Sequence, residues 1–84
     1  MSILLKAHRK AKKKHPDAIV FLKIGLFIET FDEDAITTGK IAKIYTHDYQ
    51  GHTVCGFPIS CADKYIQKLE DAGCRVVMID PRNH

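Results

Sequence analysis

The segment 25–31, Gly-Leu-Phe-Ile-Glu-Thr-Phe, constrains the fold of this chain more than any other. It predicts a β-strand, because apolar, β-branched and aromatic residues dominate it and no proline interrupts it. Side chains of a strand alternate between its two faces. We therefore expect Leu26, Ile28 and Thr30 to face a packed core.

The opposite face of this strand carries Phe27, Glu29 and Phe31. A carboxylate between two aromatic rings is a poor pattern for a dry core, because an unpaired charge is costly to bury. We expect this face to be wet, or covered by a partner, at Glu29. The ordinary alternative stays open, since most phenylalanines on strands belong to a core and most glutamates on strands lie at an edge.

The size and composition of the chain are those of one small globular domain. We expect a single domain over residues 1–84, and 45% hydrophobic residues argue against disorder. No apolar run approaches the roughly 20 residues that a membrane-spanning helix needs. We therefore expect a cytoplasmic protein that does not associate with membranes.

The cysteines and histidines predict neither a disulfide framework nor a metal site. Cys55, Cys61 and Cys74 are odd in number and contain no Cys-x-x-Cys pair, so reduced thiols are expected. His47 and His52 lie near Cys55, but a plain hairpin explains them better than a metal site does. No cofactor is expected.

Positive charge is concentrated in a predicted helix over residues 2–14. The chain before Asp17 has six lysines and arginines and no acid, which suggests an anionic partner. Helical spacing places Leu4, Ala7 and Ala11 on one side. The opposite face carries Lys6, Arg9, Lys10 and Lys13. These four are candidate phosphate contacts, and the alternative is a solvated face with basic residues near a helix C-terminus.

The remaining pattern predicts a mixed sheet with helices packed on it. Residues 18–24 are almost all apolar, which predicts a strand buried on both faces, antiparallel to the strand at 25–31. Three acids at 32–34 open a second helix. A short hairpin at 44–55, interrupted at Gly56, a helix from a capping box at 60–63 and a buried strand at 75–80 complete the order. The predicted fold class is α/β (α+β), with about five strands in a mixed sheet and about three flanking helices.

Several segments share their motifs and their order with a known family. They are Lys-His-Pro-Asp-Ala-Ile-Val-Phe at 14–21, Gly-x-Phe-x-Glu-x-Phe at 25–31, Asp-Glu-Asp-Ala at 32–35, Cys-Gly-Phe-Pro at 55–58, and the stretches 65–69 and 73–79. Together they resemble the N-terminal mismatch-recognition domain (domain I) of the MutS family of DNA mismatch-repair proteins. The resemblance covers nearly the whole chain.

The resemblance implies roles for two residues. In the family, the phenylalanine of Phe-x-Glu wedges into the minor groove and stacks on a mispaired base, and the glutamate hydrogen-bonds that base. Phe27 and Glu29 stand at these positions. The chain departs from the family at Leu26, where aspartate is usual, and at Ile28, where an aromatic residue is usual.

The function implied by the resemblance is that of a DNA-binding module in mismatch repair, without enzymatic activity, because the family's ATPase is absent from these residues. Its expected partners are mismatched or distorted double-stranded DNA and other DNA-repair proteins, with a place on the nucleoid when DNA is bound. One alternative is a protein-interaction module that kept the fold and lost DNA binding. A poorer alternative is a small metal-dependent nuclease that uses the acids at 32–34. Residues 80–84 differ from the usual end of the family's domain, which favours a stand-alone protein over a piece of a longer one.

Overall fold

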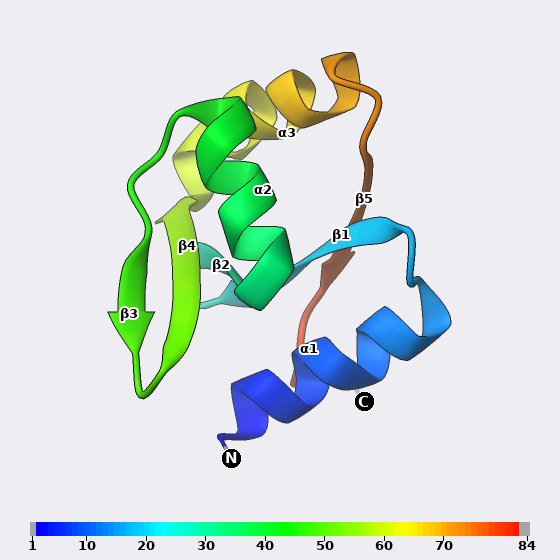
Figure 1. Ribbon diagram of the computed structural model, residues 1–84, viewed down its shortest axis with the longest axis vertical. Coiled ribbons are helices and arrows are strands. Elements are labelled where there is room, and N and C mark those ends of the chain that lie inside the picture. Colours follow the sequence, from blue (N-terminus) through cyan, green and yellow to red (C-terminus); the bar gives the residue numbers. More distant parts are fainter. Residues whose placement is uncertain (1, 83–84) are drawn as a thin grey trace.

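The computed structural model describes residues 2–82 and contains a five-stranded mixed sheet with three α-helices (Figure 1). In chain order the elements are α1 (Ile3–Lys14), β1 (Ala18–Ile24), β2 (Phe27–Phe31), α2 (Asp32–Ala42), β3 (His47–Tyr49), β4 (His52–Pro58), the 3-10 turn η1 (Ile59–Cys61), α3 (Ala62–Asp71) and β5 (Arg75–Ile79). The predicted fold class and the predicted order of helices and strands are confirmed. No helix among residues 2–82 has the length and apolar character required to cross a membrane.

The sheet has the strand order β3-β4-β2-β1-β5, and its core lies on both faces of β1. Only the β1–β5 pair is parallel. Val20 and Leu22 join a buried cluster under α1, whereas Ile19 and Phe21 join a second cluster under α2 and α3. Figure 1 shows α1 and α3 on opposite sides of β1. The expectation that this strand is buried on both faces is confirmed.

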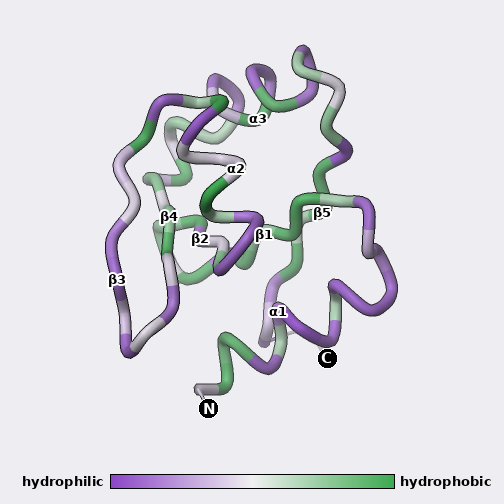
Figure 2. The backbone as a smooth tube through the Cα atoms, in the orientation of Figure 1, coloured by the Kyte–Doolittle hydropathy of each residue, from purple (hydrophilic) through white to green (hydrophobic). Residues whose placement is uncertain are grey.

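The hydropathy of the strands follows their position in the sheet (Figure 2). β1 is largely apolar along its length, while β3 at the edge is polar and all three of its residues are exposed. The expectation that β5 is a buried strand is wrong. It pairs with β1 alone and forms the other edge, so its side chains are exposed or only half-buried.

β1 and β2 form a tight hairpin whose two-residue loop is Gly25 and Leu26. Ile24 pairs with Phe27 across the loop, and Gly25 has φ +61°, which glycine adopts without a steric penalty. The expectation that Leu26 faces the core is wrong, because this residue lies in the loop and is 78% exposed. Ile28 is fully buried, as the alternation predicts.

The helix α1 begins as predicted, but it buries a different stripe. The Ser2 side chain caps it by accepting a hydrogen bond from the Leu5 N–H at 3.2 Å. The expected apolar stripe consists of Leu4, Ala7 and Ala11. The residues that are buried are Leu5, His8 and Ala11, and Leu4 and Ala7 are only half-buried beside them. The helix is therefore rotated toward a buried polar contact made by His8.

The hairpin of β3 and β4 turns at Gln50 and Gly51. Both residues have positive φ, +50° and +82°, which is the requirement of a two-residue type I′ loop. The expected interruption at Gly56 is wrong, because β4 continues through Gly56 to Pro58 and pairs with β2 along that length. The expected capping box at 60–63 is also absent, because Ser60 lies within η1 and the N-cap of α3 is Cys61, whose side chain makes no capping hydrogen bond.

Candidate nucleic-acid interface

Phe27 lies on β2, which is hydrogen-bonded on both sides, to β1 and to β4. Its backbone partners are Ile24 and Pro58, yet its side chain is 52% exposed. Phe31, on the same face of the strand, is buried in the cluster under α1. The face is thus covered at Phe31 and open at Phe27, and the exposed ring is held by one of the sheet's inner strands.

Glu29 lies between these two rings and is half-buried. It pairs with Gly56 of β4, and a Cβ atom at Gly56 would lie 3.1 Å from Cγ of Glu29 and 3.0 Å from the carbonyl oxygen of Ile28. Glycine therefore leaves the space that the Glu29 side chain occupies over β4. The expectation of a wet face at Glu29 agrees with this partial burial.

A pocket of about 290 Å³ opens beside Glu29. Its walls come from the start of α1, from β2 and from the β3–β4 hairpin. They are Ser2, Leu4, Glu29, Phe31, His47, Tyr49 and Val54. The carboxylate thus faces a solvent-accessible hollow on the α1 side of the sheet.

The four basic residues predicted as phosphate contacts are all exposed. They are Lys6, Arg9, Lys10 and Lys13. None of them forms an ion pair with any other residue in the part of the chain that the structure describes. Because α1 packs on the face of the sheet that carries Phe31, these charges lie on the same side of the sheet as Phe27 and Glu29. The structure thus puts the predicted wedge, the carboxylate and the basic helix on one side.

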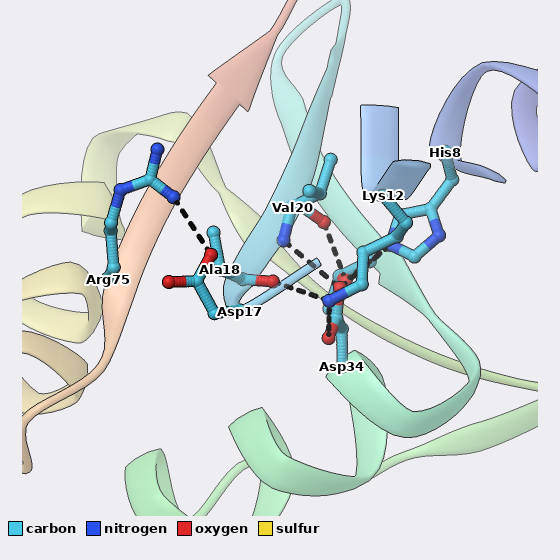
Figure 3. Close-up of polar contacts among 8 residues, drawn as sticks. His8, Lys12, Asp17, Ala18, Val20, Asp34 and Arg75 are labelled. Atoms are coloured by element: carbon cyan, nitrogen blue, oxygen red, sulfur yellow. Dashed lines mark hydrogen bonds and ion pairs between the residues drawn. The ribbon is translucent and has the colours of Figure 1, made fainter. Parts of the chain in front are cut away.

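A buried polar cluster ties α1 to the start of α2 (Figure 3). Oδ2 of Asp34 lies 3.1 Å from Nε2 of His8 and accepts a hydrogen bond from the Val20 N–H at 3.1 Å. Oδ1 of Asp34 accepts from Nζ of Lys12 at 3.0 Å, and Lys12 also donates to the Ala18 carbonyl. The Asp34 side chain is buried, so these donors replace the water it has lost.

The hydrogen bonds determine where the proton of His8 lies. The Thr30 hydroxyl donates its single proton to the Val20 carbonyl at 2.8 Å and can only accept from Nε2 of His8, 3.3 Å away. A carboxylate likewise only accepts, so Nε2 carries the hydrogen and shares it between Thr30 and Asp34. Burial by itself raises the pKa of Asp34. The hydrogen bonds from His8, Val20 and Lys12, with the charge of Lys12, outweigh it and hold the pKa below its usual value.

The three acids that open α2 do not converge on one point. Asp34 turns inward, Glu33 is exposed, and Oδ1 of Asp32 lies 2.9 Å from Nδ1 of His52. A metal-dependent nuclease needs such carboxylates to face one ion. Among residues 2–82 there is no group of three or more His, Cys, Asp or Glu side chains placed to hold a metal ion.

His8 and Lys12 were not predicted from the sequence as partners of Asp34. One signal was present: Leu5, His8 and Lys12 follow the i, i+3, i+7 spacing of one helix face. A histidine and a lysine on a buried face require an acidic partner. Asp34, one residue of an acid run, is the acid they meet.

Comparison with known proteins identifies the family to which this sequence is similar. The family model described as MutS domain I matches residues 3–84. The DNA mismatch repair protein MutS of Porphyromonas gingivalis is 40% identical over 82 residues, which cover 92% of this chain and 9% of that protein. The DNA mismatch repair protein MutS of Acholeplasma laidlawii is 39% identical over 80 residues, which cover 92% of this chain and 10% of that protein. The DNA mismatch repair protein MutS of Thermotoga neapolitana is 32% identical over 80 residues, which cover 95% of this chain and 10% of that protein.

These matches settle the family and the part of it that is present. The chain spans about a tenth of the length of the relatives it matches. The matched part is domain I, which in MutS recognises DNA and is not the ATPase, so the expectation that these residues carry no ATPase is confirmed. Both the family model and the relatives cover nearly all of this chain, and the chain therefore belongs to the MutS domain I family.

Proposed function

We propose that this domain acts in DNA mismatch repair by binding mismatched or distorted duplex DNA, with Phe27 as the stacking wedge and Glu29 as the base-contacting carboxylate. The observation that carries the proposal is the exposed Phe27 ring on a strand paired on both sides, with Glu29 two residues away on the same face. A side chain that must unstack a base step needs rigid support, and a strand inside a sheet provides it better than a loop.

The electrostatics of the same side support a polyanionic partner. The free basic residues of α1 supply the charge that neutralises phosphates, and their number determines how strongly salt weakens binding. These contacts position the duplex without reading its sequence. Discrimination then comes from Phe27, because a mismatched step costs less to unstack than a matched one.

The test is binding of fluorescently labelled duplexes, matched and mismatched at the centre, followed by anisotropy. A lone domain is expected to bind near the non-specific range of ~10⁻⁴–10⁻⁶ M. Stacking of a base on an aromatic ring is worth about 1–3 kcal/mol, so Phe27→Ala should lower the affinity for the mismatched duplex by about fivefold to 150-fold. The matched duplex should lose far less.

The control variant is Tyr45→Ala, which truncates another exposed aromatic residue. Tyr45 lies between α2 and β3 and is 98% exposed. It should leave both affinities unchanged. A domain that binds neither duplex, or a Phe27→Ala variant that keeps the parent's mismatch preference, would assign this surface to the alternative, a protein-interaction module.

Glu29→Gln tests the role of the carboxylate. An ionised carboxylate is repelled by phosphates and cannot donate a hydrogen bond, whereas a protonated one loses the charge and gains a donor. Glutamine carries no charge and supplies an N–H donor. Glu29→Gln should therefore bind both duplexes at least as tightly as the parent, with less discrimination between matched and mismatched DNA. A variant that binds every duplex much more weakly, or that keeps the parent's full discrimination, would show that Glu29 is not the base-contacting residue.

A further inference from the structure

A small apolar patch surrounds Phe27 at the end of the sheet. Leu26 is 78% exposed beside Phe27, and Ile59, which follows the end of β4, is 38% exposed. Pro58 is also exposed and is the ladder partner of Phe27. We call the exposed residues Leu26, Phe27, Pro58 and Ile59 the apolar tip.

Backbone hydrogen bonding holds the two halves of the apolar tip together. The Ile59 N–H donates to the Leu26 carbonyl at 2.8 Å, directly beyond the Phe27–Pro58 pair. Leu26 occupies the second position of a two-residue loop, and positive φ at Gly25 makes that loop tight. The Leu26 side chain is thus displayed on a short, hydrogen-bonded support rather than on a mobile loop.

The chemistry of the apolar tip matches that of a minor-groove wedge. Proteins that kink DNA from the minor groove insert phenylalanine, leucine, isoleucine, methionine or proline between base steps. Every residue of the apolar tip is one of these types. The exposed basic residues of α1 lie on the Phe27 side of the sheet, so the charge on that side favours a polyanion.

We propose that Leu26 is a second member of the wedge and sets how strongly this domain discriminates distorted from matched duplex DNA. This inference rests on the proposed function and extends it from one aromatic ring to an apolar surface. When Phe27 enters a distorted base step, the Leu26 side chain is removed from water and packs against the adjacent sugar or base. A matched step stays closed and gives Leu26 no such contact.

The experiment compares Leu26→Asn with the parent on matched and mismatched duplexes. The loop position is solvent-exposed, so the variant should keep the parent's melting temperature. Partial burial of a leucine side chain corresponds to about a threefold to tenfold change in Kd, and that loss is expected on the mismatched duplex. The salt dependence should not change, because Leu26 neutralises no phosphate. Leu26→Met should retain the parent's affinity.

Tyr45→Ser is the matched control, since it removes an exposed apolar side chain on the α2 side of the sheet. A second measurement is DNA bending, read as energy transfer between dyes on the duplex ends. Leu26→Asn should bend the mismatched duplex less than the parent does.

The outcomes separate this inference from the proposed function. If Phe27→Ala abolishes mismatch preference while Leu26→Asn matches the parent in affinity and bending, Leu26 is plain surface or a protein contact and this inference is overturned. If the parent shows no preference for the mismatched duplex, the proposed function fails and this inference fails with it. A uniform loss on both duplexes in Leu26→Asn would also overturn it.

Discussion

Replacing the buried Asp34 by asparagine should destabilise the domain more than any comparable surface change. Oδ2 of Asp34 accepts hydrogen bonds from His8 and Val20, while Oδ1 accepts a hydrogen bond from Lys12. Asparagine has one acceptor oxygen and one NH₂ group. Whichever way its amide is turned, at least one of these three donors faces another donor in a buried site.

The magnitude follows from the burial and the missing charge. A buried polar group without a partner costs about 1–3 kcal/mol, and breaking a buried ion pair at one partner costs about 3–5 kcal/mol. We therefore expect Asp34→Asn to lower the free energy of unfolding by about 3–5 kcal/mol, a large part of the ~5–15 kcal/mol typical of a domain. With about 4–8 °C per kcal/mol for a domain of this size, the melting temperature should fall by at least about 12 °C.

The assay is thermal and urea denaturation at pH 7, followed by circular dichroism. The control is Glu33→Gln, which removes the same charge at the neighbouring exposed position. It should change the free energy of unfolding by no more than about 0.5 kcal/mol. If Asp34→Asn proves as mild as Glu33→Gln, the buried cluster does not hold α1 to α2 and the reasoning from burial and donors is refuted.

The same residue predicts an acid dependence of stability. Its pKa is lowered in the folded state from the usual value of 3.8, so the unfolded chain binds this proton more readily than the native one. The contribution of Asp34 is therefore fully present above pH 3.8 and is lost as the pH falls through the lowered pKa. The parent should lose stability over that acid range, and Asp34→Asn should show a flatter curve there.

Three further experiments have definite expected outcomes. Gly56→Ala should lower the free energy of unfolding by about 1–3 kcal/mol because the added methyl group crowds Glu29. The variant should also show a weaker preference for mismatched DNA. Unchanged stability would contradict the close approach of Glu29 and Ile28 to Gly56. Changing Lys10 and Lys13 to alanine should weaken the binding of all duplexes alike. It should also reduce the slope of log affinity against log salt concentration by about 0.9 for each phosphate that is no longer neutralised. An unchanged slope would show that these lysines of α1 contact no phosphate. Burial shields the Cys55 thiol and raises its pKa. A thiol reagent at pH 8 should therefore label Cys55 only when the domain unfolds, after the other two cysteines have reacted. Labelling of all three cysteines at the same rate would contradict the burial of Cys55.

The elements that the sequence predicts well are those encoded by neighbouring residues. The largely apolar run of β1 depends only on local pattern, and this strand is found at the residues where it was predicted. The sequence predicted a wet face at Glu29, which is half-buried, but it left open whether Phe27 belongs to a core; the structure shows Phe27 exposed and Phe31, on the same face, buried.

The features that escaped prediction depend on contacts between distant parts of the chain. Leu26 was assigned to the core because the strand alternation was extended one residue too far. No local signal separates the last residue of the loop from the first residue of the strand. The edge position of β5 depends on the strand order of the finished sheet. The helical spacing places His8 on the buried face of α1, but its contact with Asp34 depends on how α1 and α2 meet, which the spacing within one helix does not determine.

The parallel pairing of β1 with β5 has a consequence for the order in which the chain folds during synthesis. Ala18 pairs with Arg75, so one edge of the most apolar strand stays open until the last strand has left the ribosome. Loop closure over so long a stretch is slow compared with the formation of the β1–β2 hairpin. During that interval the nascent chain displays an unpaired, hydrophobic strand edge, which is the kind of surface that chaperones bind and that nucleates aggregation.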